Sequence, residues 1–245
     1  MRPFFNTAIC LLIKDENAYI NEWLEWHIGI GFEHFYIYDN GSEIPISESV
    51  KSEYAPYCTF IDFSGEHANT QLECYDDALN RYRHCTKWLA FVDTDEFIRP
   101  INGEKIDDFL KGYEQHDGLY IRWVIYNANG LVKKDKRSQR ERFTRVSDCI
   151  PPKPFGKSII QPSKIRTMGT HFPTGKIGEY DIVDSDGRWM KTACSEFSKN
   201  EHIVIDHYFT RSHEEWLEKA KRGSCDPRCD RKYDEFYRFN PEMEV

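Results

Sequence analysis

Three acidic residues, Asp93, Asp95 and Glu96, follow a short apolar run at residues 88–92 (WLAFV). The run has the length and composition of a β-strand buried on both faces, and open α/β sheets bind ligands where such strands end. Asp93 and Asp95 are two residues apart, so an extended chain would point both carboxylates to one face, where they could share a divalent cation and, through it, a diphosphate. Glu96 would point to the opposite face, which favours a buried basic partner.

The D-x-D pattern alone is weak evidence for a metal site, because the chain holds 41 acidic residues. The same pattern recurs at Asp184 and Asp186, where the following Gly187 predicts a hairpin turn with no metal. A D-x-D is more often a solvated turn than a metal site. The apolar strand in front of Asp93 reverses that preference for this copy.

Two histidines could join the acidic cluster. His207 follows a β run at residues 202–205 and could present a ring nitrogen to a metal, or it could simply be hydrogen-bonded. Asp93, Asp95 and His207 together would make an oxygen-rich site with one imidazole, which suits Mn²⁺ better than Mg²⁺. His171 follows a turn and could line the same pocket, although turn histidines are usually exposed.

Basic residues close to His171 in the sequence could meet a phosphate, or could simply lie on the surface: Lys157, Lys164 and Arg166. The sequence contains no G-x-S-x-G, no G-x4-G-K-[ST] and no H-E-x-x-H pattern. Because these catalytic motifs are absent, the reaction class that remains is metal-assisted chemistry on a phosphorylated ligand, with carboxylates as possible bases.

The first hundred residues have the rhythm of a parallel sheet, with strands expected at 4–13, 34–38, 59–63 and 88–92. A helix is expected between Asn17 as N-cap and Gly31, a weak one at 47–54, and another after a capping box that begins at Thr70. Right-handed crossovers would place every strand-to-helix elbow at one edge of the sheet. That edge would collect Lys14, Asp15, Glu16, Asp39 with Asn40, Gln71, Asp93 and Asp95, although residues 39–41 could equally be a mere turn.

Residues after Pro100 predict a mixed extension of this sheet. We expect a helix at 106–113, a basic loop at 133–142, and a last helix from a capping box at Ser212 to Gly223, with Trp216, Leu217 and Ala220 facing inward. Strands are expected at 119–126, 143–146, 158–160 and 203–205. No linker composition marks a boundary, so the sequence predicts one domain over residues 1–245.

The net charge of −8 and the pI near 5.6 argue against nucleic acid as the main partner. No run approaches the roughly 20 apolar residues that span a bilayer, and no signal sequence is apparent, so a cytoplasmic protein is expected. The eight scattered cysteines suit reduced thiols. Only Cys225 and Cys229 are clustered, and without a second pair they do not predict zinc.

Several stretches together resemble a known family, the bacterial glycosyltransferases related to glycosyltransferase families 2 and 92, which have a GT-A fold. They are residues 10–17 (CLLIKDEN), 22–31 (EWLEWHIGIG), 34–42 (HFYIYDNGS), Gln71 with Tyr75, 88–97 (WLAFVDTDEF), 157–173, and His207-Tyr208 followed by Arg222-Gly223. The resemblance implies a GT-A-like (Rossmann-like), mostly parallel central sheet flanked by helices, with a mixed β extension on the acceptor side. It divides the chain into a nucleotide-binding half (1–100), an acceptor half (101–223) and a tail (224–245).

The same resemblance implies roles for the donor side. Asp95 would be the direct ligand of Mn²⁺ (or Mg²⁺), Asp93 would lie nearer the ribose or a bound water, and His207 would complete the metal site. Asp39 would contact the base of the nucleotide, and the elbow of Lys14, Asp15 and Glu16 the nucleoside. Gln71 and Lys157 complete the expected donor-binding set.

The implied donor is a UDP-hexose, and the implied acceptor is a glycan or lipid-linked glycan hydroxyl. Such chemistry would take place in the cytoplasm or at the inner face of the membrane, in surface polysaccharide or glycoconjugate synthesis. Transfer would be inverting, with a base from the acceptor half: Glu179, Asp181 or Glu141. Trp123 could stack on a sugar or belong to the core. The alternatives are a non-catalytic nucleotide-sugar or glycan-binding protein with the same fold and, less favoured, a metal-dependent phosphohydrolase.

Overall fold

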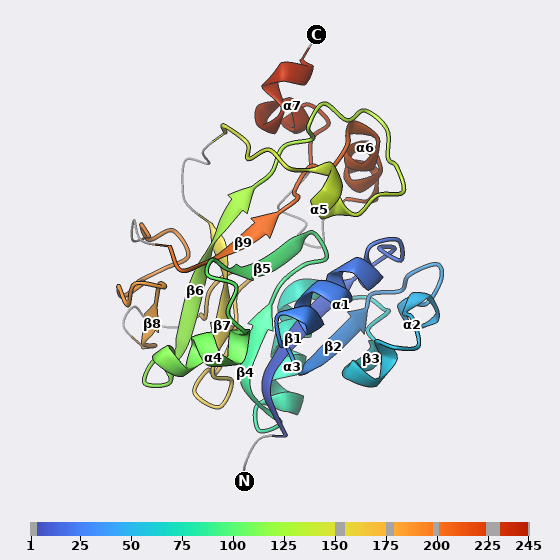
Figure 1. Ribbon diagram of the computed structural model, residues 1–245. Helices are drawn as coiled ribbons and strands as arrows, with labels where there is room; N and C mark the ends of the chain where they lie inside the picture. Colours follow the sequence, from blue (N-terminus) through green and yellow to red (C-terminus); the bar gives the residue numbers. More distant parts are fainter. Residues whose placement is uncertain (1–3, 150–154, 175–178, 198–200, 224–230, 245) are drawn as a thin grey trace.

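A curled β-sheet runs through the computed structural model, which describes residues 4–149, 155–174, 179–197, 201–223 and 231–244 (Figure 1). The strand order is β3-β2-β1-β4-β7-β6-β9-β5, and β8 pairs with β6. Cys225 and Cys229 lie outside the described residues.

The first half of the sheet is parallel, because β1 pairs in parallel with both β2 and β4, and β2 pairs in parallel with β3. Its elements are β1 (Phe5–Ile13), α1 (Ile20–Gly29), β2 (His34–Asp39), α2 (Ile46–Ser49), a 3₁₀ turn (Ala55–Tyr57), β3 (Cys58–Asp62), α3 (Thr70–Tyr82) and β4 (Thr86–Phe91). The predicted order of alternating strands and helices is confirmed.

Two helix starts differ from the prediction. The N-cap of α1 is Tyr19, not Asn17, whose side chain instead donates hydrogen bonds to the carbonyl of Ile44 (3.0 Å) and to Ser49 Oγ (2.8 Å) and so ties down the next loop. The N-cap of α3 is Asn69, whose side chain accepts from the Leu72 amide, so Thr70 is already inside the helix. Both caps were misplaced because asparagine bonds equally well to a loop or to a helix start.

The second half is mixed, because β7 runs antiparallel to both β4 and β6, and β5 runs antiparallel to β9. Its elements are β5 (Glu96–Pro100), α4 (Ile106–Leu110) with a 3₁₀ turn (Lys111–Tyr113), β6 (Gly118–Ile125), α5 (Gln139–Arg142), β7 (Gly156–Ile160), β8 (Ile182–Val183), β9 (Ile203–His207), α6 (His213–Arg222), α7 (Glu235–Phe239) and a 3₁₀ turn (Pro241–Met243).

The strand predicted at residues 143–146 is wrong. Ser138 and Glu141 form a capping box that starts the short helix α5, and after it only Val146 makes an isolated bridge, to Tyr126. The capping box predicted at Ser212 is confirmed. Ser212 caps α6, and Gly223 ends the helix with a φ of 82°. Leu217 on α6 was expected to face inward but is 38% exposed.

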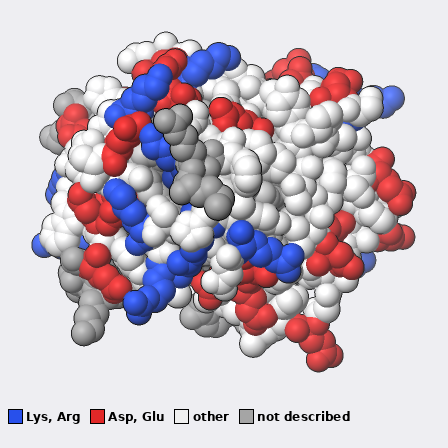
Figure 2. Space-filling model, turned by 90° about the horizontal axis from the view of Figure 1, so that it is seen from below, with Lys and Arg blue, Asp and Glu red and all other residues white. Residues whose placement is uncertain are grey.

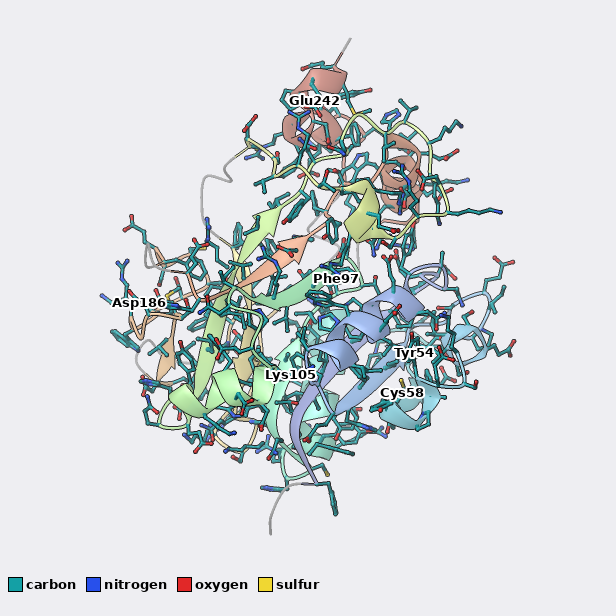
Figure 3. The ribbon with its side chains drawn as sticks, viewed as in Figure 1. Tyr54, Cys58, Phe97, Lys105, Asp186 and Glu242 are labelled. Carbon is teal, nitrogen blue, oxygen red and sulfur yellow. The ribbon has the colours of Figure 1, made fainter. Side chains whose placement is uncertain are left out.

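Two apolar layers cover the sheet. One contains α1 and α4 with Trp23, Trp88 and Phe97, and the other contains α3 with Tyr75 and residues of the opposite sheet face. Phe97, at the start of β5, lies beside α1 in Figure 3, and its ring centroid is 5.8 Å from that of His27. Trp88 of β4 and Phe97 of β5 therefore belong to the same apolar layer as α1.

The second D-x-D forms the predicted turn. Asp184 Oδ1 accepts the amides of Asp186 (3.0 Å) and Arg188 (2.9 Å), and Gly187 has a φ of 78°. Figure 3 shows Asp186 at the outer edge of the molecule, beside β8. This copy of the pattern is therefore structural, as the sequence predicted.

The surface in Figure 2 carries acidic and basic side chains mixed with uncharged ones, and the face in view has no extended basic patch. No helix in the described ranges is long and apolar enough to cross a membrane. The cysteines in the described part of the chain are free thiols.

Candidate active site

A cavity of about 970 Å³ lies where the parallel strands end. Parallel strands with right-handed crossovers place their elbows at one sheet edge, so residues distant in sequence meet there. Within residues 1–100 it is lined by Lys14, Glu16, Asn40, Gln71, Asp93, Asp95 and Glu96, and in the C-terminal half by Trp123, Lys157, His171, His207, Lys219, Arg222, Arg231 and Glu235. In Figure 1, α5, α6 and α7 lie at the end of the molecule opposite the N-terminus, beyond these strand ends.

The carboxylates of Asp93 and Asp95 do not share a face, because the chain turns after β4 instead of remaining extended. The Glu96 amide donates to the carbonyl of Asp93 (3.0 Å), and the indole Nε1 of Trp23 donates to the carbonyls of Asp93 and Glu96 (both 3.0 Å). Trp23 in the core thus stabilises the turn, and the two aspartates bind different lysines, Asp93 binding Lys157 and Asp95 binding Lys219.

Asp95 is buried and has two cationic or polar neighbours. Its Oδ2 accepts a hydrogen bond from Lys219 Nζ and lies 3.7 Å from His207 Nε2. Burial by itself raises the pKa of Asp95, but Lys219 and then His207 lower it to well below its usual range. Burial also lowers the pKa of His207. Asp95 is therefore an ionised carboxylate beside a neutral imidazole at neutral pH.

Asp93 and Glu96 share the buried amine of Lys157. Lys157 Nζ donates to Asp93 Oδ2 (3.1 Å) and lies 3.9 Å from Glu96 Oε2, which itself accepts the Asp93 amide (2.9 Å). Burial works against the charge, yet Asp93 and Glu96 raise the pKa of Lys157 to well above its usual range. The buried basic partner expected for Glu96 is Lys157. The expected position of Glu96 on the opposite face is wrong, because Glu96 lines the same cavity as Asp93.

Glu16 ties the first elbow to the C-terminal half. Its carboxylate accepts hydrogen bonds from Arg211 (2.6 Å) and Arg222 (2.5 Å), and Thr94 Oγ1 lies 3.3 Å away. Burial raises the pKa of Glu16, but the two arginines lower it further than burial raises it. Glu16 lines the cavity, where its charge is already neutralised by protein cations.

Asp15 and Asp39 were expected to contact the nucleotide, but their carboxylates accept hydrogen bonds from backbone amides of the loop after β2. Asp39 accepts the amides of Ser42 and Ile46 (both 2.9 Å), and Asp15 accepts the amide of Glu43 (2.8 Å). Neither residue lines the cavity, whereas Asn40 does. The turn interpretation of residues 39–41 describes Asp39 correctly.

The three residues expected to supply a base do not line the cavity. Glu141 accepts the backbone amide of Ser138 (2.9 Å) at the start of α5. Asp181 pairs with His116 Nδ1 (2.8 Å), and Glu179 is exposed. The acids that do line it and are partly exposed are Asp93 and Glu235.

Aromatic rings form one wall of the cavity. The ring centroid of Trp123 lies 4.4 Å from that of His207 and 5.2 Å from that of His171. Trp123 Nε1 is buried without a hydrogen-bond partner within the described ranges. Burial lowers the pKa of His171 to about 4, so this ring is neutral at pH 7. Of the nearby cations, Lys157 lines the cavity, but Lys164 and Arg166 do not.

The residues present do not fit a bound Mn²⁺ or Mg²⁺ ion as they are arranged. Asp95 and His207 have suitable donor atoms, but the ammonium of Lys219 lies on the same carboxylate oxygen and Asp93 is turned to Lys157. In the described part of the chain, no group of three or more His, Cys, Asp or Glu side chains is placed to hold a metal ion. Asp95 Oδ2 is thus already paired with Lys219.

Sequence reasoning missed several residues that line the cavity, among them the charged residues Lys219, Arg231 and Glu235. Lys219 lies near the C-terminal end of the helix that was predicted to begin at Ser212, and it is only 7% exposed. One signal was available, because Lys219 follows Glu215 by four residues and Trp216 by three, on the buried side of α6. Arg231 and Glu235 carry no such signal.

A mostly parallel sheet with a charged cavity at its carboxyl edge defines the class of α/β proteins that bind ligands at strand ends. The chain belongs to glycosyltransferase family 92, whose family model matches residues 6–222. The expected GT-A-like α/β fold class is thereby confirmed.

The curated relatives that match include plant proteins. Galactan beta-1,4-galactosyltransferase GALS3 of Arabidopsis thaliana is 26% identical over 217 residues, covering 77% of this chain and 42% of its own length. A family 92 glycosyltransferase protein of rice, Oryza sativa subsp. japonica, is 23% identical over 164 residues, covering 67% of this chain and 28% of its own length. The chain therefore spans less than half the length of these relatives.

Among solved structures, S. aureus TarS 1-349 is similar with a TM-score of 0.45 and 11% identity, over 87% of this chain and 62% of that chain.

Proposed function

We propose that this chain transfers a hexose from a UDP-linked nucleotide sugar, the donor that the family resemblance implies, to a hydroxyl of a glycan or lipid-linked glycan, with inversion at the anomeric carbon. The observation that carries the proposal is the cavity at the carboxyl edge of the parallel sheet, lined by the first elbow, by Asp93 and Asp95, and by the cations of the C-terminal half. Membership of glycosyltransferase family 92 supports the reaction class.

The charges in the cavity suit a departing nucleoside diphosphate. Lys157, Lys219 and Arg222 line it, and each is already held in place by a carboxylate. Pre-oriented cations in a partly dry site stabilise the negative charge that develops on a leaving group. These side chains would bind and orient the diphosphate, while the aromatic wall at Trp123 would offer a face for a sugar ring.

A carboxylate would remove the proton from the acceptor hydroxyl as that hydroxyl attacks the anomeric carbon. Asp93 and Glu235 are the acids of the cavity with exposed surface, so they replace Glu179, Asp181 and Glu141 as the base we propose. Asp93→Asn and Glu235→Gln, assayed separately, distinguish the two: the base is the residue whose loss lowers kcat by about a hundredfold or more while donor binding is retained.

Mn²⁺ (or Mg²⁺) remains a prediction from the sequence. Such an ion, when bound, supplies charge that stabilises a diphosphate leaving group. The cytoplasm or the inner face of the membrane, and a role in surface polysaccharide or glycoconjugate synthesis, also remain proposals that rest on the family resemblance.

Donor screening tests the proposed function. UDP-galactose stands first in the panel because one relative is named a galactan beta-1,4-galactosyltransferase, and release of UDP with and without glycan acceptors is measured. We expect turnover of one donor, and its loss in Asp95→Asn. The matched control is Asp108→Asn, an exposed aspartate on α4 outside the cavity, which should retain full activity.

The second candidate function is a non-catalytic nucleotide-sugar or glycan-binding protein. It is favoured by the position of the three expected bases, Glu141, Glu179 and Asp181, outside the cavity. Calorimetry on the same panel separates the two functions. Donor binding without turnover of any donor, in the presence of an acceptor library, contradicts the enzyme and supports the binding protein.

A further inference from the structure

Basic residues are concentrated in one loop of this acidic protein. The chain has a net charge of −8, yet residues 131–142, which run from the end of β6 to the end of α5, contain six basic residues and only two acidic ones. One of the six, Arg142, is buried against Glu215. The other five are exposed and do not line the cavity, so the proposed transfer reaction does not account for them. They are Lys133, Lys134, Lys136, Arg137 and Arg140.

Hydrogen bonds hold this loop against the start of α6. The amide of His213 donates to the carbonyl of Leu131 (3.1 Å), and the amide of Glu214 donates to the carbonyl of Val132 (2.9 Å). Lys133 Nζ donates to Glu214 Oε1 (2.9 Å). In Figure 1 the loop between β6 and α5 runs beside α6, at the end of the molecule opposite the N-terminus. The basic side chains therefore lie next to the exposed face of this helix.

Three apolar side chains are exposed around the same helix. Leu217 is 38% exposed, Val132 is 54% exposed and Tyr233 is 58% exposed. Leu217 belongs to α6 itself, whose buried side contains Trp216 and Lys219. The carbonyl of Tyr233 accepts the indole N–H of Trp216 (3.2 Å), which ties Tyr233 to the helix. Single exposed apolar residues are normal on a protein surface, but here three of them border one helix beside a basic loop.

We call this region the outer α6 surface. Lys221 lies four residues after Leu217, on the same face of α6, and Lys232 precedes Tyr233. Of the acidic residues nearby, Asp135 is paired with Arg137 (2.6 Å) and Glu214 is paired with Lys133 (2.9 Å). The outer α6 surface thus combines excess positive charge with exposed apolar side chains. It consists of Val132, Lys133, Lys134, Lys136, Arg137, Leu217, Lys221, Lys232 and Tyr233.

This combination suits the surface of an anionic phospholipid bilayer. Each lysine or arginine close to such a surface strengthens binding about fivefold. Apolar side chains on the same face add to this by entering the boundary between headgroups and acyl chains. An acidic polysaccharide would pair with the lysines, but it would not bury Val132 or Leu217. The exposed apolar side chains therefore favour a bilayer over a soluble polyanion.

We propose that the outer α6 surface docks on an anionic phospholipid bilayer, with its basic side chains at the headgroups and Val132, Leu217 and Tyr233 between them. The buried side of α6 supplies Lys219 to the lining of the cavity, and Arg222 at the end of the helix also lines it. A helix with its side chains is about 10–12 Å across, so docking would hold the cavity about that far from the membrane. A lipid-linked glycan acceptor would then reach the cavity from the bilayer, and this last clause rests on the proposed function.

The test of docking is co-sedimentation of the protein with lipid vesicles, in the absence of any sugar donor. Vesicles of phosphatidylcholine with about one-third phosphatidylglycerol are compared with vesicles of phosphatidylcholine alone. We expect binding to the anionic vesicles to be about tenfold tighter or more, and to weaken as salt is added. Equal binding to both kinds of vesicle, or binding to neither, overturns the proposal.

Two double variants locate the contact. Lys136→Gln combined with Lys221→Gln removes two exposed charges of the outer α6 surface and should weaken binding to anionic vesicles about tenfold or more. Lys51→Gln combined with Lys111→Gln is the matched control, because it removes two exposed lysines that lie outside this surface. The control should bind like wild type. Equal binding by the two double variants shows that the outer α6 surface is not the contact.

Two single variants on α6 separate the apolar contribution from the charge. Leu217→Gln should weaken binding to anionic vesicles by about threefold or more, because a polar side chain is not buried among lipids. Unchanged binding by Leu217→Gln contradicts a bilayer and points to an acidic polymer. Glu218→Gln removes an exposed negative charge from the same helix and should strengthen binding. Weaker binding by Glu218→Gln contradicts the electrostatic part of the proposal.

The outcomes also separate docking from the proposed function. Vesicle binding is measured without a donor, so it supports docking even if no sugar donor is ever turned over. The link to transfer is tested with the Lys136→Gln, Lys221→Gln double variant. It should keep wild-type turnover with a soluble glycan acceptor and lose turnover with an acceptor held in anionic vesicles. Equal turnover losses with both acceptors contradict the link and leave docking to be judged by sedimentation.

Discussion

Glu215→Gln tests whether a buried ion pair holds α6, and with it Lys219, in position. Glu215 on α6 accepts hydrogen bonds from Arg142 (2.6 and 3.0 Å), from Tyr19 (2.5 Å) and from Ser212, which begins the helix. Its side chain is 2% exposed and that of Arg142 is 1% exposed. The substitution keeps the shape of the side chain but leaves the guanidinium of Arg142 buried without its counter-charge.

The expected cost follows from the pKa of Glu215. Burial raises this pKa, but the hydrogen bonds from Arg142, Ser212 and Tyr19 lower it from 4.5 to about 2. Because the pKa is depressed in the folded state, the stabilisation is complete above pH 4.5 and is lost as the pH falls towards 2. The shift corresponds to about 3 kcal/mol at pH 7 and about half of that at pH 3. Removal of one partner of a buried pair costs a similar amount, about 3–5 kcal/mol.

The assay is the free energy of unfolding by urea, measured from pH 7 down to pH 3. Glu215→Gln should be less stable than wild type by about 3 kcal/mol at pH 7, and the difference should shrink towards pH 3. Glu218→Gln, an exposed glutamate on the same helix, should change stability by less than about 0.5 kcal/mol. A difference that is the same at every pH would refute the reasoning, since the loss would then not come from the charge of Glu215.

Two further predictions concern the core. Gly156→Ala should abolish folding, or lower Tm by more than about 5 °C, because the added Cβ would lie 1.8 Å from the carbonyl oxygen of Ile121 on β6. The control Gly112→Ala should be tolerated, because nothing lies within 4 Å of its added Cβ. Equal melting curves for the two variants would contradict this prediction. Burial raises the pKa of the Cys74 thiol well above its usual range. A disulfide reagent should therefore modify the exposed Cys194 quickly and Cys74 only on unfolding. Rapid modification of Cys74 at pH 8, mapped by mass spectrometry, would be inconsistent with the structure.

The parallel half of the fold was predictable because its signals are local. Apolar strands of five to nine residues alternate with amphipathic helices, and the crossover rule then gathers the elbows. The crossover rule predicts that Lys14, Glu16, Gln71 and Asp93 lie at one edge of the sheet, and all four line the cavity. The capping box at Ser212 succeeded for the same reason, since a cap depends on neighbours within one helical turn.

Long-range partners were predicted less well. Asp15 and Asp39 satisfy backbone amides of the next loop, and nothing in their own sequence neighbourhood distinguishes a loop carboxylate from a ligand-binding one. The expected bases at residues 141, 179 and 181 were drawn from the acceptor half without knowledge of which of its loops face the strand ends. Glu235, which does line the cavity, lies on a short helix with no distinguishing pattern.

The sequence by itself determined that a buried strand delivers Asp93 and Asp95 to the binding edge of a parallel sheet, because strand periodicity and crossover handedness are properties of local chain geometry. Only the tertiary structure decided what those acids meet there. Trp23 holds the turn after β4, and Lys157 donates a hydrogen bond to Asp93. Lys219, which lies 124 residues after Asp95 in the chain, donates a hydrogen bond to Asp95. Those pairings depend on how distant elements pack, and electrostatic partners 60 or more residues apart leave no periodic trace in one sequence.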